Sequence, residues 1–228
     1  MKNHDLRRVD TVVRASVFAT KWKLDHPPYG AVVKRLHAAA VRLPALEIEQ
    51  RDAHSSWQGH STVLDDLRDQ LRESHMIKLS RVGRKILKHK PGVRAALKVP
   101  GKRASSKALV AAATTMAKFM QEDAQVFLDE DQPRNAFAKL RAATRKFASC
   151  QRTIDEQIER QKKATAALAK EVPPAREDVD ILDGLLAERK KGTDGLASDW
   201  AQAKRVGKRK GAPRDGKWNW PTKKHRPK

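Results

Sequence analysis

Histidine and cysteine are the residues of this chain that could serve as metal ligands, nucleophiles or acid–base catalysts, and their spacing matches no known arrangement. The eight histidines are scattered, and none lies in the HExxH or ExxH patterns that hold zinc or di-iron centres. The one cysteine, Cys150, falls near an apolar helical stripe, which is more typical of a small core residue than of a nucleophile. A GxxxxGK[S/T] or GxGxxG phosphate loop is also missing. We therefore expect no enzymatic activity, no metal site and no cofactor.

Lysine and arginine can act together in this chain, because they are concentrated in two segments. The 228 residues carry a net charge of +22, and residues 78–103 and 201–228 each contribute a net +10. The first segment has ten basic residues and no acidic one. Localised positive charge of this kind is typical of a surface that binds a polyanion.

The first basic segment is predicted to present its charges from a helix whose opposite side is apolar. The alternative is a solvated face, with cations favoured near a helix C-terminus. The candidate nucleic-acid-binding residues here are Lys78, Arg81, Arg84, Lys85, Lys88, Lys90, Arg94, Lys102 and Arg103.

The second basic segment interleaves basic residues with two tryptophans. Cations of this kind neutralise phosphates, and indole rings stack on bases. A solubilising tail, or a segment that inserts into a ribonucleoprotein or an acidic partner, would have the same composition. The candidate nucleic-acid-binding residues here are Lys208, Arg209, Lys210, Trp218, Trp220, Lys223 and Lys224.

Two short stretches resemble the repeats of the conserved-histidine α-helical (CHAD) domain. They are His4-Asp-Leu-Arg7 followed by Arg14, and Leu140-Arg141 followed by Arg145-Lys146. The resemblance implies an all-helical double bundle that binds polyphosphate. Thr11 and Val12 stand where the first repeat has an arginine pair, and Ala138 stands where the second has histidine. The chain is therefore not assigned to that family, and a polyphosphate-binding bundle stays as an alternative.

The elements that position these segments are predicted to be helices. Strand signals are nearly absent, and residues that favour helices dominate. Apolar stripes at helical spacing predict helices over about 4–25, 28–57, 61–90, 105–127, 133–171, 175–190 and 195–205. We expect Pro44 to kink or break the second helix, Gly59 to end it, and Pro173-Pro174 to end the longest one. The predicted fold is all-α, a multi-helix bundle of five to seven helices.

The most regular stripe lies in the helix over 133–171, where the spacing alternates between three and four residues as in a coiled coil. Its members are Phe137, Leu140, Thr144, Phe147, Gln151, Ile154, Ile158, Gln161, Thr165 and Leu168. Only six of these ten are apolar, which is weak for a free two-stranded coil and suits a long helix packed within a bundle. The same helix packed on another protein would make the chain a structural or adaptor protein, which is the second functional interpretation.

The chain is predicted to divide into an N-terminal helical half over 1–92, a basic linker over 93–103, a C-terminal helical half over 104–206 and a disordered basic tail over 207–228. A single cysteine and a charged N-terminus favour a cytoplasmic location, including the nucleoid or a ribonucleoprotein. No stretch approaches the apolar length of a membrane span. The leading interpretation is non-enzymatic binding of nucleic acid through phosphate contacts, with weak sequence specificity.

Overall fold

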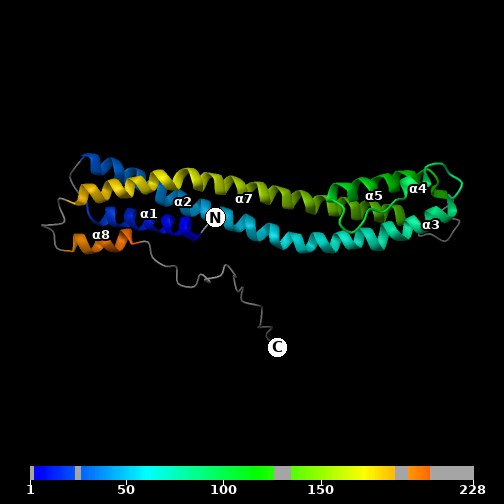
Figure 1. Cartoon of the computed structure of the whole chain (residues 1–228), viewed down its shortest axis with the longest axis horizontal. Helices are drawn as coiled ribbons and strands as arrows, with labels where there is room; N and C mark the ends of the chain where they lie inside the picture. The colour runs from blue at the N-terminus through cyan, green and yellow to red at the C-terminus, as the bar shows by residue number, and fades with distance from the viewer. Residues whose placement is uncertain (1–2, 24–26, 126–134, 188–194, 206–228) are drawn as a thin grey trace, which may run out of the picture. The chain divides into compact units, whose positions relative to one another are not determined.

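The computed structural model describes residues 3–23, 27–125, 135–187 and 195–205. Every regular element within these ranges is a helix, which confirms the predicted all-α multi-helix fold (Figure 1). The elements are α1 (Asn3–Lys21), α2 (Pro27–Asp69), the π-helix η1 (Gln70–Ile77), α3 (Lys78–Ile86), α4 (Val93–Ala96), α5 (Ser106–Gln121), α7 (Ala136–Ala187) and α8 (Leu196–Lys204). The tail over 207–228, predicted to be disordered, lies outside the described residues.

The chain packs as two compact units, each with its own apolar core. Unit 1 consists of residues 1–49 and 163–228, and unit 2 consists of residues 50–162. The sequence-based halves over 1–92 and 104–206 each include parts of both units, and the predicted linker over 93–103 belongs to unit 2. Val93 and Leu97 are buried in the core of this unit.

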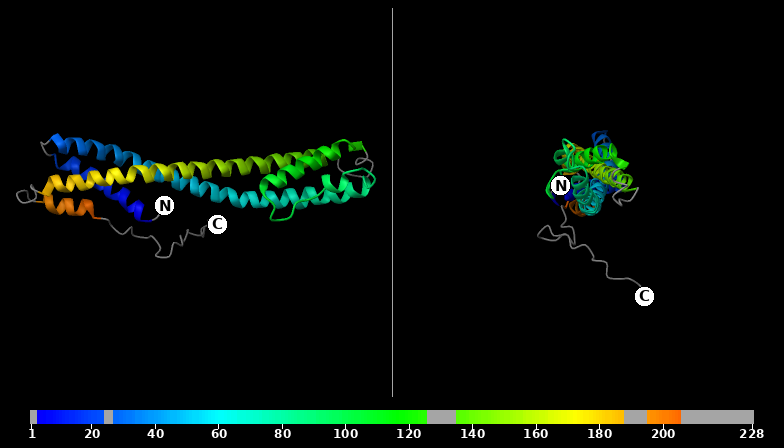
Figure 2. Two further views of the ribbon diagram at one scale, coloured as in Figure 1. Left: turned by 45° about the horizontal axis from the view of Figure 1, so that its top comes forward. Right: turned by 90° about the vertical axis from the view of Figure 1, so that its right-hand side faces the viewer.

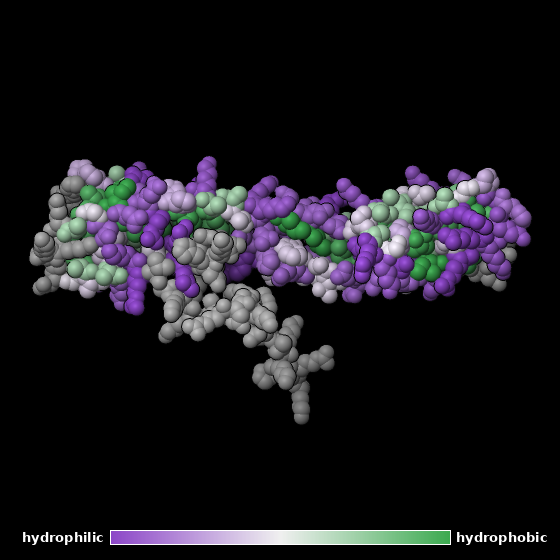
Figure 3. Space-filling view, in the orientation of Figure 1, coloured by the Kyte–Doolittle hydropathy of each residue, from purple (hydrophilic) through white to green (hydrophobic). Residues whose placement is uncertain are grey.

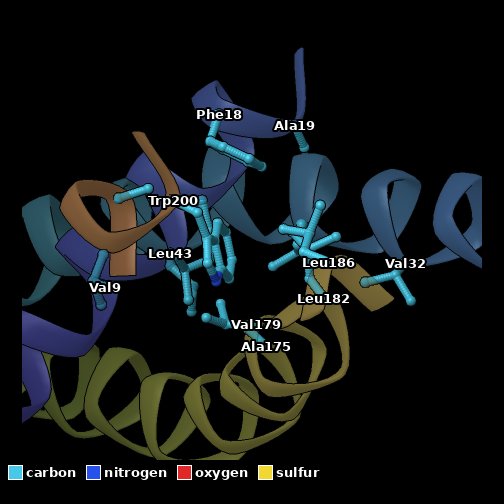
Figure 4. Close-up of a cluster of buried hydrophobic side chains, with 14 of the residues drawn as sticks. Val9, Phe18, Ala19, Val32, Leu43, Ala175, Val179, Leu182, Leu186 and Trp200 are labelled. Atoms are coloured by element: carbon cyan, nitrogen blue, oxygen red, sulfur yellow. The ribbon is translucent and has the colours of Figure 1, made fainter. Parts of the chain in front are cut away.

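The core of unit 1 joins α1 and α8 to parts of α2 and α7. Trp200 of α8 is completely buried, and Figure 4 shows its ring among Leu43 of α2 and Val179 of α7. The Trp200 indole N–H donates a 2.6 Å hydrogen bond to the carboxylate of Asp183, so its polar atom is also satisfied. The predicted helix through Leu196 and Trp200 is confirmed.

The prediction that Pro173-Pro174 ends the longest helix is wrong, because α7 runs through both prolines. A proline in a helix interior removes a backbone hydrogen bond and costs about 3 kcal/mol relative to alanine. Both prolines are exposed, whereas Leu168, Val172, Ala175 and Val179 around them are buried at alternating steps of four and three. The free energy gained by burying this continuous apolar stripe offsets the cost of the two prolines.

The prediction that Gly59 ends a helix is also wrong. Pro44 and Gly59 both lie inside α2, which continues to Asp69. A glycine in a helix interior costs about 1 kcal/mol. Ala53 before Gly59 and Leu64 after it are both buried. Packing of α2 on either side of the glycine therefore keeps this part of the chain helical.

A π-helix accommodates an irregular step in the apolar stripe that follows α2. Leu71 and Met76 are both completely buried, although Met76 comes five positions after Leu71. An α-helix brings residues three or four apart onto one face, whereas the i→i+5 bonds of a π-helix align residues five apart. The π-helix η1 spans this step and keeps the stripe directed at the core.

Unit 2 packs α3, α4 and α5 together with the first part of α7, and Figure 2 shows α5 beside these turns of α7. Ser105 caps α5, because its Oγ accepts a 3.2 Å hydrogen bond from the N–H of Ala108. This confirms the predicted start of that helix. The segment from α3 to α5 carries the first basic segment.

Candidate nucleic-acid interface

Most of the predicted binding residues of the first segment are exposed to solvent. They extend from α3 through α4 into the loop before α5, and Figure 3 shows hydrophilic side chains gathered over this end of unit 2. The exposed members are Lys78, Arg81, Arg84, Lys85, Lys88, Arg94, Lys102 and Arg103. We call these eight side chains the basic face. None of them forms an ion pair with a residue in the described ranges.

Lys90 differs from its neighbours because its charge is neutralised within the protein. Its ammonium lies 2.9 Å from a carboxylate oxygen of Glu122 and also donates to Asp123. It lies 4.6 Å from the centre of the Phe119 ring. The hydrogen bonds to Asp123 and Glu122 raise the pKa of Lys90. We therefore leave Lys90 out of the basic face.

Two hydrogen bonds fix the backbone between α4 and α5. Ser80 Oγ donates a 2.6 Å hydrogen bond to the carbonyl of Leu97, and Arg84 Nη2 donates to the same carbonyl at 3.2 Å. Leu97 itself is completely buried. Arg84 therefore has a structural contact in addition to its exposed surface.

Two arginines hold the next part of the same loop. Arg68 donates to the carbonyl of Ala104 at 2.7 Å and to the hydroxyl of Ser106 at 3.1 Å, while Arg72 donates to the carbonyl of Pro100 at 3.0 Å. Arg68 also lies over the Phe147 ring. These bonds hold the backbone on either side of Lys102 and Arg103. Because the backbone is already ordered, less conformational entropy is lost when a ligand binds.

His75 lies in the π-helix just before the basic face. Desolvation, followed by repulsion from Lys139 and Lys78, lowers the pKa of His75 below 6.5. Two lysines therefore act on the half-buried imidazole in addition to its desolvation. An anion bound at Lys78 would reduce this repulsion, so His75 can serve as a local reporter.

The second basic segment continues beyond Arg205, the last residue that the structure describes. Its seven candidate residues, Lys208, Arg209, Lys210, Trp218, Trp220, Lys223 and Lys224, all lie outside the described residues. The interface in the described chain therefore rests on unit 2.

A second set of cations in unit 2 lines a groove between α5 and α7. The sequence singled out Arg141 and Arg145 only through the resemblance to the CHAD repeats, and it did not single out Lys118. The groove has a volume of about 490 Å³ and is lined by Lys118 of α5 and by Arg141 and Arg145 of α7. Helical spacing relates residues within one helix, so it does not indicate that Lys118 faces these two arginines. Only the packing of α5 on α7 brings them together.

One hydroxyl–imidazole pair has the residue types of a nucleophile and its base. Ser16 Oγ lies 2.5 Å from His37 Nδ1, and Thr20 Oγ1 lies 3.5 Å from the other ring nitrogen. Both groups that contact the ring are hydroxyls, whereas a catalytic triad has a carboxylate at one of these positions. Ser16 is also only 6% exposed in the middle of α1. The pair therefore acts as a polar link between α1 and α2.

Within the described residues, no cluster of three or more histidine, cysteine or acidic side chains is arranged to hold a metal ion. The helices in the same ranges include none that is both long enough and apolar enough to span a membrane.

Comparisons with protein-family models, with curated proteins and with solved structures find no match. The chain belongs, by its fold, to the class of all-α multi-helix proteins.

Proposed function

We propose that this protein binds nucleic acid without catalysing a reaction, mainly through the phosphate backbone and with weak sequence specificity. The observation that carries this proposal is the basic face of unit 2, whose eight exposed cations are free of ion pairs within the described residues. Positive side chains that are not neutralised internally are available to replace the counterions of a polyanion.

The fixed backbone beneath the basic face supports the proposal. Arg68, Arg72 and Ser80 hold the loop that carries Lys102 and Arg103. Phosphate contacts set the position of a protein on nucleic acid but carry no sequence information by themselves. We therefore expect similar affinity for unrelated sequences, with the basic tail over 207–228 as a second contact.

The test measures the affinity of fluorescent oligonucleotides by anisotropy as a function of salt. If about five phosphates of a duplex are neutralised, the logarithm of the binding constant K falls with the logarithm of the salt concentration, with a slope of about −4.5. The triple variant Arg81→Gln, Lys85→Gln and Lys88→Gln should make the slope shallower by about 2.7. Arg84 is left unchanged because it also holds the Leu97 carbonyl.

A matched control removes three exposed lysines of unit 1, through Lys34→Gln, Lys163→Gln and Lys170→Gln. It lowers the net charge equally, so it should change the slope less if the basic face is the site. A flat salt profile, or no binding at low salt, would contradict the proposal and favour the adaptor interpretation. Binding of inorganic polyphosphate without binding of oligonucleotides would favour the polyphosphate alternative.

A further inference from the structure

The groove between α5 and α7 combines a positive rim with a small apolar floor. Lys118, Arg141 and Arg145 are exposed on its rim, and none of its lining residues is acidic. Arg141 is held in place because its Nη1 donates a 2.8 Å hydrogen bond to the side-chain oxygen of Gln121. Lys118 and Arg145 form no ion pair within the described residues, so their charges are available to a ligand.

The floor of the groove consists of short side chains. Ala113 is completely buried and Ala117 is 4% exposed, so neither projects into the groove. The hydroxyls of Thr114 and Thr144 donate to backbone carbonyls of their own helices. The floor therefore offers mainly apolar contact, whereas the polar interactions come from the charged rim.

This combination suits a ligand with both phosphate groups and flat apolar surfaces. Single-stranded nucleic acid has this chemistry, because its phosphates need cations and its unpaired bases bury apolar faces. The axes of two packed helices lie only about 8–10 Å apart, and the double helix is too wide to enter a groove between them. A single strand is narrow enough.

Cations on α5 connect the groove with the basic face. Lys107 and Lys118 are eleven residues apart, which is about three helical turns, so they share one side of α5 about 16 Å apart. Lys107 is exposed and follows Lys102 and Arg103 of the basic face closely in the chain. The side of α5 that borders the groove therefore has cations near both ends.

We infer that the α5–α7 groove is a binding site for one strand of single-stranded nucleic acid. Lys118, Arg141 and Arg145 neutralise its phosphates, and its bases lie over the floor, where the exposed Thr114 offers its methyl group. This inference rests on the proposed function and adds to it a preference for single strands over duplexes.

The sharpest test uses two adjacent threonines of α5. Thr114 lines the groove and Thr115 does not, while both are exposed in the same helix. The Thr114→Glu variant places a carboxylate among the three cations, and Thr115→Glu adds the same charge outside the groove. Thr114→Glu should weaken binding of a labelled oligothymidine of about 15 nucleotides by roughly tenfold, and Thr115→Glu by much less. Binding of a duplex of equal length should respond alike to the two changes.

A second variant combines Lys118→Gln, Arg141→Gln and Arg145→Gln. Its slope of log K against log salt for the single strand should be shallower by about 2 than that of the unchanged protein. The unit 1 triple variant with glutamine at 34, 163 and 170 is again the matched control for net charge.

A footprinting experiment on the unchanged protein tests the groove even if a variant fails to fold. Lysine acetylation of the unchanged protein, quantified by mass spectrometry, should modify Lys118 in the free protein and much less when the oligothymidine is bound. Lys170 of unit 1 should react equally in both states.

The outcomes separate this inference from the proposed function. If the unchanged protein binds neither single strands nor duplexes, both fail. If it binds them but Thr114→Glu and Thr115→Glu behave alike and Lys118 stays reactive, the groove inference is overturned and the basic face remains. If inorganic polyphosphate alone protects Lys118, the ligand class inferred for the groove is wrong.

Discussion

Ser80 Oγ donates a 2.6 Å hydrogen bond to the backbone carbonyl of Leu97, which is seventeen residues away in the chain. The bond joins α3 to the segment between α4 and α5, and both residues are buried. It therefore connects the helix that carries Lys78, Arg81, Arg84 and Lys85 to the segment that leads to Lys102 and Arg103.

Removal of this hydroxyl should destabilise unit 2. The Ser80→Ala variant leaves the buried Leu97 carbonyl with only the longer bond from Arg84, at a cost of about 1 kcal/mol in the free energy of unfolding. Urea unfolding followed by circular dichroism measures this change. Ser149→Ala, at an exposed position in α7, reports the gain in helix propensity from the same substitution. Equal stability of the two variants would show that the hydrogen bond contributes nothing.

Replacement of the two prolines inside α7 should stabilise the protein. Pro173→Ala with Pro174→Ala restores two helical N–H groups at exposed positions, whereas the loss of rigid prolines makes the unfolded chain more flexible. We expect a net gain of about 2 kcal/mol or more in the free energy of unfolding. A loss of stability on urea unfolding would instead mean that the burial of Val172 and Ala175 depends on the prolines.

The stability of unit 1 should decrease in acid through Asp199. Hydrogen bonds from Lys21 and then from Trp22 lower the pKa of Asp199 below 3.8. The folded state therefore binds this proton less readily than the unfolded state, so the stabilisation is complete above about pH 4 and is lost as the pH falls through the lowered pKa. The Asp199→Asn variant should show a smaller drop in melting temperature between pH 5 and lower pH.

Asp180→Asn is the control for this prediction. Asp180 is an exposed carboxylate of α7 that lies 3.6 Å from Arg176. Asp199→Asn should reduce the drop in melting temperature in acid more than Asp180→Asn does. If both variants respond alike, the contacts of Asp199 do not contribute to the acid sensitivity.

His75 should report the binding of a polyanion to the basic face. Burial lowers the pKa of His75, and the nearby Lys139 and Lys78 lower it further. Phosphates bound at Lys78 would counter this repulsion, so the pKa of His75 should rise when an oligonucleotide is added. Titration of the imidazole proton resonances by NMR measures the shift. The imidazole resonances of His37, which contacts Ser16 in unit 1, should not move when the oligonucleotide is added at constant pH.

Without ligand, the same histidine makes stability depend on pH in the neutral range. The folded state disfavours the protonated imidazole, so the unfolded state binds more protons between the lowered pKa and 6.5. The free energy of unfolding should therefore fall as the pH drops below about 6.5. His75→Gln should reduce this dependence in urea unfolding, and an unchanged profile would contradict it.

Local patterns in the sequence determined the helical fold and several of its details. The cap at Ser105 follows from the preference of its hydroxyl for a helix N-terminus. The stripe through Leu140, Phe147 and Ile154 indicated which face of α7 is buried, because residues three and four apart share one face of a helix. The concentration of cations over 78–103 likewise needed no coordinates.

The tertiary structure decided where helices continue and which distant charges meet. Pro173-Pro174 and Gly59 oppose helix locally, but the buried residues on either side gain more from packing than the backbone loses. Lys90 is basic in sequence, yet the fold places Glu122 and Asp123 on its ammonium. The groove at Lys118 and Arg141 depends on the packing of α5 on α7, because no helical period relates residues of two different helices.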